Sequence, residues 1–154
     1  KDPTSEFDND YTIADWLMGY SPVDDITYVR GFLGRMLFPG EDGVKKVRIL
    51  SGGEKVRVLL SRMMIQASNV LILDEPTNGL DPIGIQELRS LIRSFPSKGI
   101  TVILSSHILS EVQLIADDIG IISNGILGYE GQMNKDEDLE NLFIEVVRKS
   151  QEGR

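Results

Sequence analysis

The chain has 154 residues, no cysteine, a hydrophobic fraction of 41% and a formal net charge of −8. This size allows one domain with a buried core, and the composition excludes wholesale disorder, disulfides and Cys-based zinc sites. No apolar run approaches the about 18 residues of a membrane span, and the opening from Lys1 has no signal-peptide pattern. The acidic balance argues against direct nucleic-acid binding, and we expect a cytoplasmic protein.

The first part of the sequence predicts a helical subdomain over residues 1–67. A helix is expected to start at Thr12, a second to cover residues 24–37, and a third to cover residues 51–66. Between the last two, Pro39-Gly40 marks a turn.

The apolar pattern changes over residues 68–150, where short apolar runs alternate with helical spacing. The alternation predicts an α/β fold with a parallel sheet. The expected elements are strands at 70–73, 100–104 and 119–122, helices at 82–95, 107–116 and 138–147, and a tight hairpin turn at Asn124-Gly125. Residues 151–154 are expected to form a tail.

Two adjacent carboxylates, Asp74 and Glu75, follow the predicted strand at 70–73. A parallel strand delivers its last residues to the carboxyl edge of the sheet, where ligands bind in open α/β folds. There one carboxylate can hold Mg²⁺ through its water shell, and the next can orient or deprotonate an attacking water. The alternative is a solvated acidic strand end before a turn at Pro76.

The segment Ser51-Gly52-Gly53-Glu54 opens the third predicted helix. Its hydroxyl, its glycines and the helix dipole suit a phosphate anion. The same residues also form a capping box, because a glutamate follows the serine by three positions. Both interpretations are open at this point.

Two further polar residues follow predicted elements. His107, the only histidine, comes after the strand at 100–104 and can hydrogen-bond a terminal phosphate. Its alternative is a partly buried histidine at a helix start. Asp81 precedes Pro82 and can be a plain N-cap.

The order of the motifs resembles ATP-binding-cassette (ABC) ATPases: Leu-Ser-Gly-Gly-Glu, Leu-Ile-Leu-Asp-Glu-Pro-Thr-Asn, Gly-Leu-Asp-Pro and Ser-Ser-His. The resemblance covers nearly the whole chain and implies a P-loop NTPase-type fold with ATP and Mg²⁺ as cofactors. It implies that Asp74 holds the Mg²⁺ shell, Glu75 is the general base and His107 is the switch histidine. The signature residues Ser51, Gly52, Gly53 and Glu54 would meet ATP held by the other subunit of a head-to-tail dimer, with Asp81 in the D-loop at that interface.

The sequence also departs from the family pattern. A P-loop requires Gly-x-x-x-x-Gly-Lys-Ser/Thr, and no Gly-Lys dipeptide occurs in these residues. Lys1-Asp2 falls beside the family's Q-loop position, so we expect a cassette fragment that is inactive alone. The resemblance places the P-loop strand between the strands at 100–104 and 119–122, and its loss predicts self-association.

Residues 10–77 resemble the ABC-F class, which acts on ribosomes, whereas residues 79–131 resemble the ATPase subunit of a bacterial drug or lantibiotic exporter. A chimera joined near residues 77–80 is therefore expected. The partners implied are a homo-oligomer or a P-loop-bearing half, and in the parent families a membrane transporter subunit or the ribosome. A non-catalytic interaction module and an engineered chimera without a physiological role are the alternative hypotheses.

Overall fold

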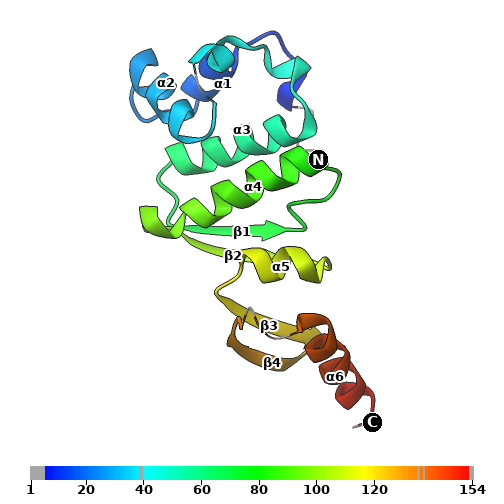
Figure 1. The fold of residues 1–154 in the computed structure, drawn as a ribbon. Coiled ribbons are helices and arrows are strands. Elements are labelled where there is room, and N and C mark those ends of the chain that lie inside the picture. The colour runs from blue at the N-terminus through cyan, green and yellow to red at the C-terminus, as the bar shows by residue number, and fades with distance from the viewer. Residues whose placement is uncertain (1–5, 39, 135, 137, 153–154) are drawn as a thin grey trace. The chain divides into compact units, whose positions relative to one another are not determined.

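A computed structural model describes residues 6–38, 40–134, 136 and 138–152. The chain forms two compact units, Lys1–Leu104 and Ser105–Arg154, and each is described by itself (Figure 1). The predicted starting point at Lys1-Asp2, the turn residue Pro39 and the end of the predicted tail lie outside the described residues.

Three helices and their connections make the first part of the first unit. They are α1 (Ile13–Met18), α2 (Ile26–Arg35) and α3 (Gly52–Ile65), with two 3₁₀ turns, Gly40–Val44 and Val47–Ile49, before α3. The Thr12 side chain caps α1 by accepting a hydrogen bond from the Asp15 N–H, as the sequence predicted. All three helices contribute to one apolar core, which includes Ile13, Leu17, Val29, Leu33, Val58 and Leu60.

A strand–helix–strand unit completes the first unit: β1 (Val70–Asp74), α4 (Pro82–Ser94), a 3₁₀ turn (Pro96–Lys98) and β2 (Thr101–Ser105). The two strands pair and run in the same direction, so the parallel sheet is confirmed (Figure 1). Along β1, Leu71 and Leu73 are buried while Ile72 is 76% exposed. The sheet therefore packs through one face, and α3 and α4 lie on one side of it (Figure 1).

The second unit contains α5 (Leu109–Ile115), β3 (Asp118–Ser123), β4 (Ile126–Gln132) and α6 (Leu139–Glu152). β3 and β4 pair antiparallel through Asn124 and Gly125, whose φ angles of 53° and 77° confirm the tight turn. The alternation of strands and helices wrongly assigned β3 to the parallel sheet, since the two-residue turn supplies a nearer partner.

The strand β4 and the last residues of α6 were not predicted from the sequence. β4 was missed because Gly128 and Gly131 weaken its strand pattern. Gly128 allows α6 to approach the hairpin, since a methyl group there would lie 2.6 Å from Cγ1 of Val146. α6 continues to Glu152, beyond the predicted end at residue 147. Residues 148–152 are all polar, so no apolar spacing signals this extension, while the Ser150 and Ser123 hydroxyls share a hydrogen bond of 2.7 Å.

Candidate functional site

Three of the predicted motifs lie at one end of the first unit. Figure 1 shows the carboxyl end of β1 on the same side of this unit as the N-termini of α3 and α4. β1 ends at Asp74, α3 begins after Ser51, and α4 begins after Asp81. The segment of Asp74 and Glu75 (called Walker B in ABC ATPases), the signature segment and the D-loop thus all lie at that end.

The signature segment forms the capping box that its sequence allowed. The Ser51 Oγ accepts a hydrogen bond from the Glu54 N–H at 3.3 Å, and the Glu54 carboxylate accepts one from the Ser51 N–H at 2.9 Å. The first N–H groups of a helix have no intrahelical acceptor, so those of Gly52 and Gly53 suit an anion. The Ser51 hydroxyl hydrogen can rotate between the Glu54 carboxylate and such an anion. The cap is therefore confirmed, and it is compatible with phosphate binding.

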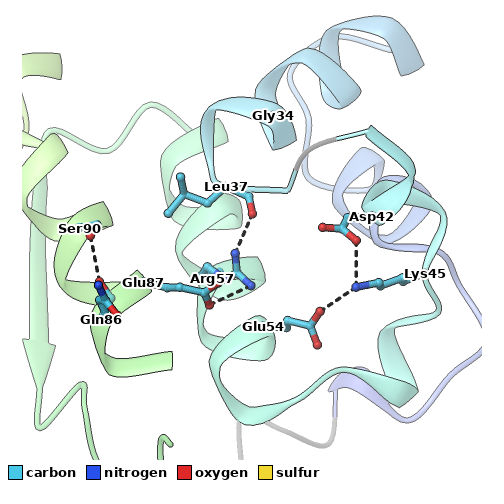
Figure 2. A pocket seen from close by; sticks show the side chains of 9 residues that line it. All are labelled: Gly34, Leu37, Asp42, Lys45, Glu54, Arg57, Gln86, Glu87 and Ser90. Carbon is cyan, nitrogen blue, oxygen red and sulfur yellow. Dashed lines mark hydrogen bonds and ion pairs between the residues drawn. The ribbon is translucent and has the colours of Figure 1, made fainter. Parts of the chain in front are cut away.

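The Glu54 carboxylate is held by two groups at once. Besides the Ser51 N–H it accepts a hydrogen bond from Lys45 Nζ at 3.1 Å, and Lys45 also lies 2.9 Å from Asp42 (Figure 2). Burial favours the neutral form of Glu54, but the hydrogen bonds from Ser51 and Lys45 outweigh it and hold its pKa below 4.5. Hydrogen bonds to Asp42 and then Glu54 raise the Lys45 pKa. Glu54 thus holds the start of α3 by its hydrogen bond with the Ser51 N–H, and its direct contact with nucleotide stays a prediction.

The D-loop packs against the signature segment. Asp81 caps α4, because its Oδ1 accepts a hydrogen bond from the Gly84 N–H at 2.7 Å. A methyl group added at Gly52 would lie 3.6 Å from Cδ2 of Leu80 and 3.7 Å from the Gly79 oxygen. Residues of both motifs line a hollow of about 260 Å³, namely Ser51, Gly53, Glu54, Arg57, Asp81, Ile83, Gly84 and Glu87. The structure therefore brings the predicted signature and D-loop residues together.

Glu75, the residue that follows β1, has an unusual backbone conformation. Asp74 is exposed, and Glu75 is half-buried with a φ of 46°, which is rare for a residue with a side chain. The Asn78 N–H donates to the Glu75 oxygen and the Leu80 N–H to the Thr77 oxygen, so two successive turns lead from β1 to the D-loop. Non-glycine residues in this conformation cluster at functional sites.

A magnesium ion fits this arrangement through one carboxylate. Within the described ranges, no group of three or more histidine, aspartate and glutamate side chains could enclose a metal. Mg²⁺ needs only one or two protein carboxylates and keeps several waters. Asp74, exposed at the carboxyl end of β1, can supply such a ligand.

His107 lies in the other unit, in an exposed bend between β2 and α5. The prediction that a helix begins at His107 is wrong by two residues, because α5 starts at Leu109. The Ser106 hydroxyl accepts a hydrogen bond from the Ile108 N–H, a local turn that competes with the helix. The grouping of His107 with Asp74 and Glu75 stays a prediction.

Arg57 and its partners were not predicted from the sequence. Arg57 is 7% exposed, donates from Nη1 to the Leu37 oxygen at 2.6 Å, pairs with Glu87 at 3.2 Å and lies 4.7 Å from the centre of the Phe38 ring. These groups adjoin a pocket of about 650 Å³ between α2, α3 and α4 (Figure 2). The available signal was the position of Arg57 three residues before Leu60, on the buried stripe of α3.

Comparisons with known proteins agree with this geometry. The sequence profile of the family described as ABC transporter matches residues 8–78. The chain is 47% identical over 148 residues to the uncharacterized ABC transporter ATP-binding protein YkpA of Bacillus subtilis, covering 94% of this chain and 26% of YkpA. It is 52% identical over 99 residues to the lantibiotic transport ATP-binding protein SrtF of Streptococcus pyogenes, covering 64% of this chain and 43% of SrtF.

The fold matches that of a solved cassette. The ADP conformation of MJ1267, an ATP-binding cassette of an ABC transporter, superposes with a TM-score of 0.68 at 22% identity, covering 85% of this chain and 53% of MJ1267. The chain thus spans less than half of the curated relatives named here and about half of this structure. Its fold is therefore that of an ATP-binding cassette, and its sequence is similar to ATP-binding proteins of ABC transporters.

Proposed function

We propose that this chain supplies the signature, Walker B and D-loop parts of an ATP-hydrolysing cassette site. The observation that carries the proposal is the packing of the Ser51 cap against the D-loop, at the end of the unit where β1 delivers Asp74 and Glu75. Helix N-termini favour phosphate, and adjacent carboxylates serve a metal and a water. Together these are the groups that phosphoryl transfer to water requires.

Each residue has a distinct role in this proposal. Ser51, Gly52 and Gly53 bind the γ-phosphate of ATP through hydroxyl and N–H groups, and Asp81 holds the D-loop beside them. Glu75 orients the attacking water and accepts its proton, while His107 senses the terminal phosphate. Asp74 holds Mg²⁺ through its waters, and bound Mg²⁺ neutralises phosphate charge.

A polypeptide of residues 1–154 has no P-loop sequence of its own, so it requires one from another chain. Most phosphate contacts of a cassette come from P-loop amides and its lysine. We expect this polypeptide alone to bind Mg-ATP very weakly and to hydrolyse none. Micromolar binding in calorimetry would contradict that expectation.

The test supplies the missing loop in trans. The 154-residue chain is mixed with a polypeptide that carries the P-loop half of a related cassette, and phosphate release is measured. Hydrolysis should appear only in the mixture and disappear with Glu75→Gln, whereas the matched exposed change Glu41→Gln should leave it intact. Restored hydrolysis that survives Glu75→Gln would refute the role of Glu75, and no hydrolysis in the mixture would refute the proposal.

A second candidate function is a non-catalytic interaction or self-association module. It is favoured by large apolar side chains on the strands that are more than half exposed, namely Ile72, Ile103, Ile122, Ile126 and Leu127. Light scattering at increasing concentration tests it, and a strictly monomeric mass would count against self-association. Docking on a membrane transporter subunit or the ribosome is a further proposal for the parent protein.

Origin and location are also proposals. The 52% identity to SrtF over 99 residues supports the exporter-like part of a chimera, while YkpA aligns across the expected junction over 148 residues. The DNA sequence upstream of the Lys1 codon would show whether Lys1 is a cloning boundary.

In the part of the chain that the structure describes, no helix has the length and apolar character to cross a bilayer. A cytoplasmic location is proposed for the parent protein.

A further inference from the structure

The N-termini of α3 and α4 touch through two glycines, Gly53 and Gly84. A methyl group added at Gly53 would lie 3.0 Å from Cα of Gly84, and one added at Gly84 would lie 3.4 Å from Cα of Gly53. Both distances are shorter than or at the limit of ordinary contact, and in both cases the neighbouring atom is backbone. A methyl group at Gly53 would therefore require the α4 backbone to shift by a few tenths of an ångström, so the absence of a side chain there permits the present separation.

The same contact is tied to both helix caps. A methyl group at Gly84 would also lie 3.2 Å from Oδ1 of Asp81, the atom that accepts the Gly84 N–H hydrogen bond. On the other helix, Gly53 lies between Ser51 and Glu54, the two residues of the capping box. Any separation of the glycines therefore shifts Ser51 and Asp81 relative to each other.

A second link holds the same two helices one turn further along. Arg57, four residues after Gly53, pairs with Glu87, three residues after Gly84, at 3.2 Å. Residues at these spacings share a helix face. The buried Arg57 also donates to the Leu37 oxygen, which leaves its guanidinium little freedom to move. The glycine contact and this ion pair together fix both the distance and the rotation between α3 and α4.

We propose that Gly84 is a positioning residue that lets the signature Ser51 and the D-loop Asp81 move as one rigid unit. The proposal rests on the proposed function, because the purpose of the unit is to present both residues to a nucleotide bound by another cassette. Gly84 touches no nucleotide in this proposal. It acts by keeping the α4 N-terminus against Gly53.

The contact is tested first without any substitution. A nuclear Overhauser effect between the α-protons of Gly53 and Gly84 should be observed in the labelled wild-type chain. Its absence would overturn the proposal whatever the behaviour of the variants.

The sign of a stability change gives the second test. An alanine within a helix normally stabilises relative to glycine, so Gly31→Ala, in the middle of α2 with nothing within 4 Å of the added methyl, should raise the urea midpoint. Gly84→Ala should instead lower the midpoint, and Gly53→Ala should lower it further. A midpoint raised by Gly84→Ala as by Gly31→Ala would overturn the proposal.

The positioning role is read from the reconstituted reaction. At a temperature where circular dichroism shows Gly84→Ala to be folded, kcat should fall by about 10-fold or more, with KM for ATP nearly unchanged. Gly31→Ala should keep wild-type kinetics. Full activity of folded Gly84→Ala would refute this inference alone. A wild-type mixture without hydrolysis would refute the proposed function and the positioning role with it, and the first two tests would still decide the contact.

Discussion

The two compact units differ in how they bury apolar side chains. The first unit has a core supplied by α1, α2 and α3, together with one covered face of its sheet. In the second unit, the buried apolar residues among those described are Ile121, Leu139 and Val146. A unit of this size with so small a core is marginal on its own. Most of the stability therefore resides in the first unit, while the second depends on a hairpin and one helix.

The largest expected effect separates the two units directly. Leu17→Ala, at a fully buried position, should lower the free energy of unfolding by about 2–5 kcal/mol. Ile122→Ala, at a position 69% exposed, should change it by less than about 0.5 kcal/mol. Urea unfolding followed by the fluorescence of Trp16 reports the first unit, and hydrogen exchange in β3 and β4 reports the second. Equal effects of the two substitutions would contradict the difference between the units.

The core of the second unit is probed at Gly128. Alanine there would place a methyl group 2.6 Å from Cγ1 of Val146, so Gly128→Ala should destabilise the packing of α6 on the hairpin by about 1–3 kcal/mol. Hydrogen exchange should accelerate in β3, β4 and α6 and stay unchanged in α1–α3. Acceleration throughout the chain would show that the units unfold together.

A helix cap of the first unit gives a smaller effect. Ser51→Ala removes the acceptor for the Glu54 N–H and should cost about 1 kcal/mol, measured by urea unfolding. Ser51→Asn keeps a cap acceptor and should recover most of the loss. Both variants should abolish reconstituted hydrolysis if the Ser51 hydroxyl meets the phosphate, so recovery of activity by Ser51→Asn would contradict that role.

The smallest expected effect concerns pH. Because the folded-state pKa of Glu54 lies below 4.5, its stabilisation is present above pH 4.5 and is lost as the pH falls through the lowered pKa. The exposed partner Lys45 limits the size to about 1 kcal/mol or less. A hydrogen bond from Lys149 also lowers the pKa of Glu145 in α6. The contribution of Glu54 is therefore measured as the difference in unfolding free energy between the wild type and Glu54→Gln as the pH falls. If the two stability profiles run parallel over this pH range, Glu54 makes no such contribution.

Much of the fold followed from local sequence signals. The caps at Thr12, Ser51 and Asp81 depend on the residue type at one position, which is why each helix start was predictable. The hairpin turn after β3 was predicted from Asn124-Gly125, whereas the extent of β4 was not, because its glycines weaken the strand pattern.

The candidate site was also predictable only in part. Its motif residues could be named from the sequence, whereas the Arg57–Glu87 pair could not, since it joins α3 to α4 and depends on how these helices pack. The contact between Gly53 and Gly84 joins positions on two different helices, so only the packed structure could reveal it.

The left-handed backbone of Glu75 has a practical consequence for the choice of inactivating substitution. At a φ of 46°, replacement by glycine would relax the turn after β1 as well as remove the carboxylate, so any loss of turnover would have two causes. Glutamine has the same shape and the same conformational cost at this position. Glu75→Gln therefore separates the proposed proton-accepting role of the carboxylate from the conformation of the loop that carries it.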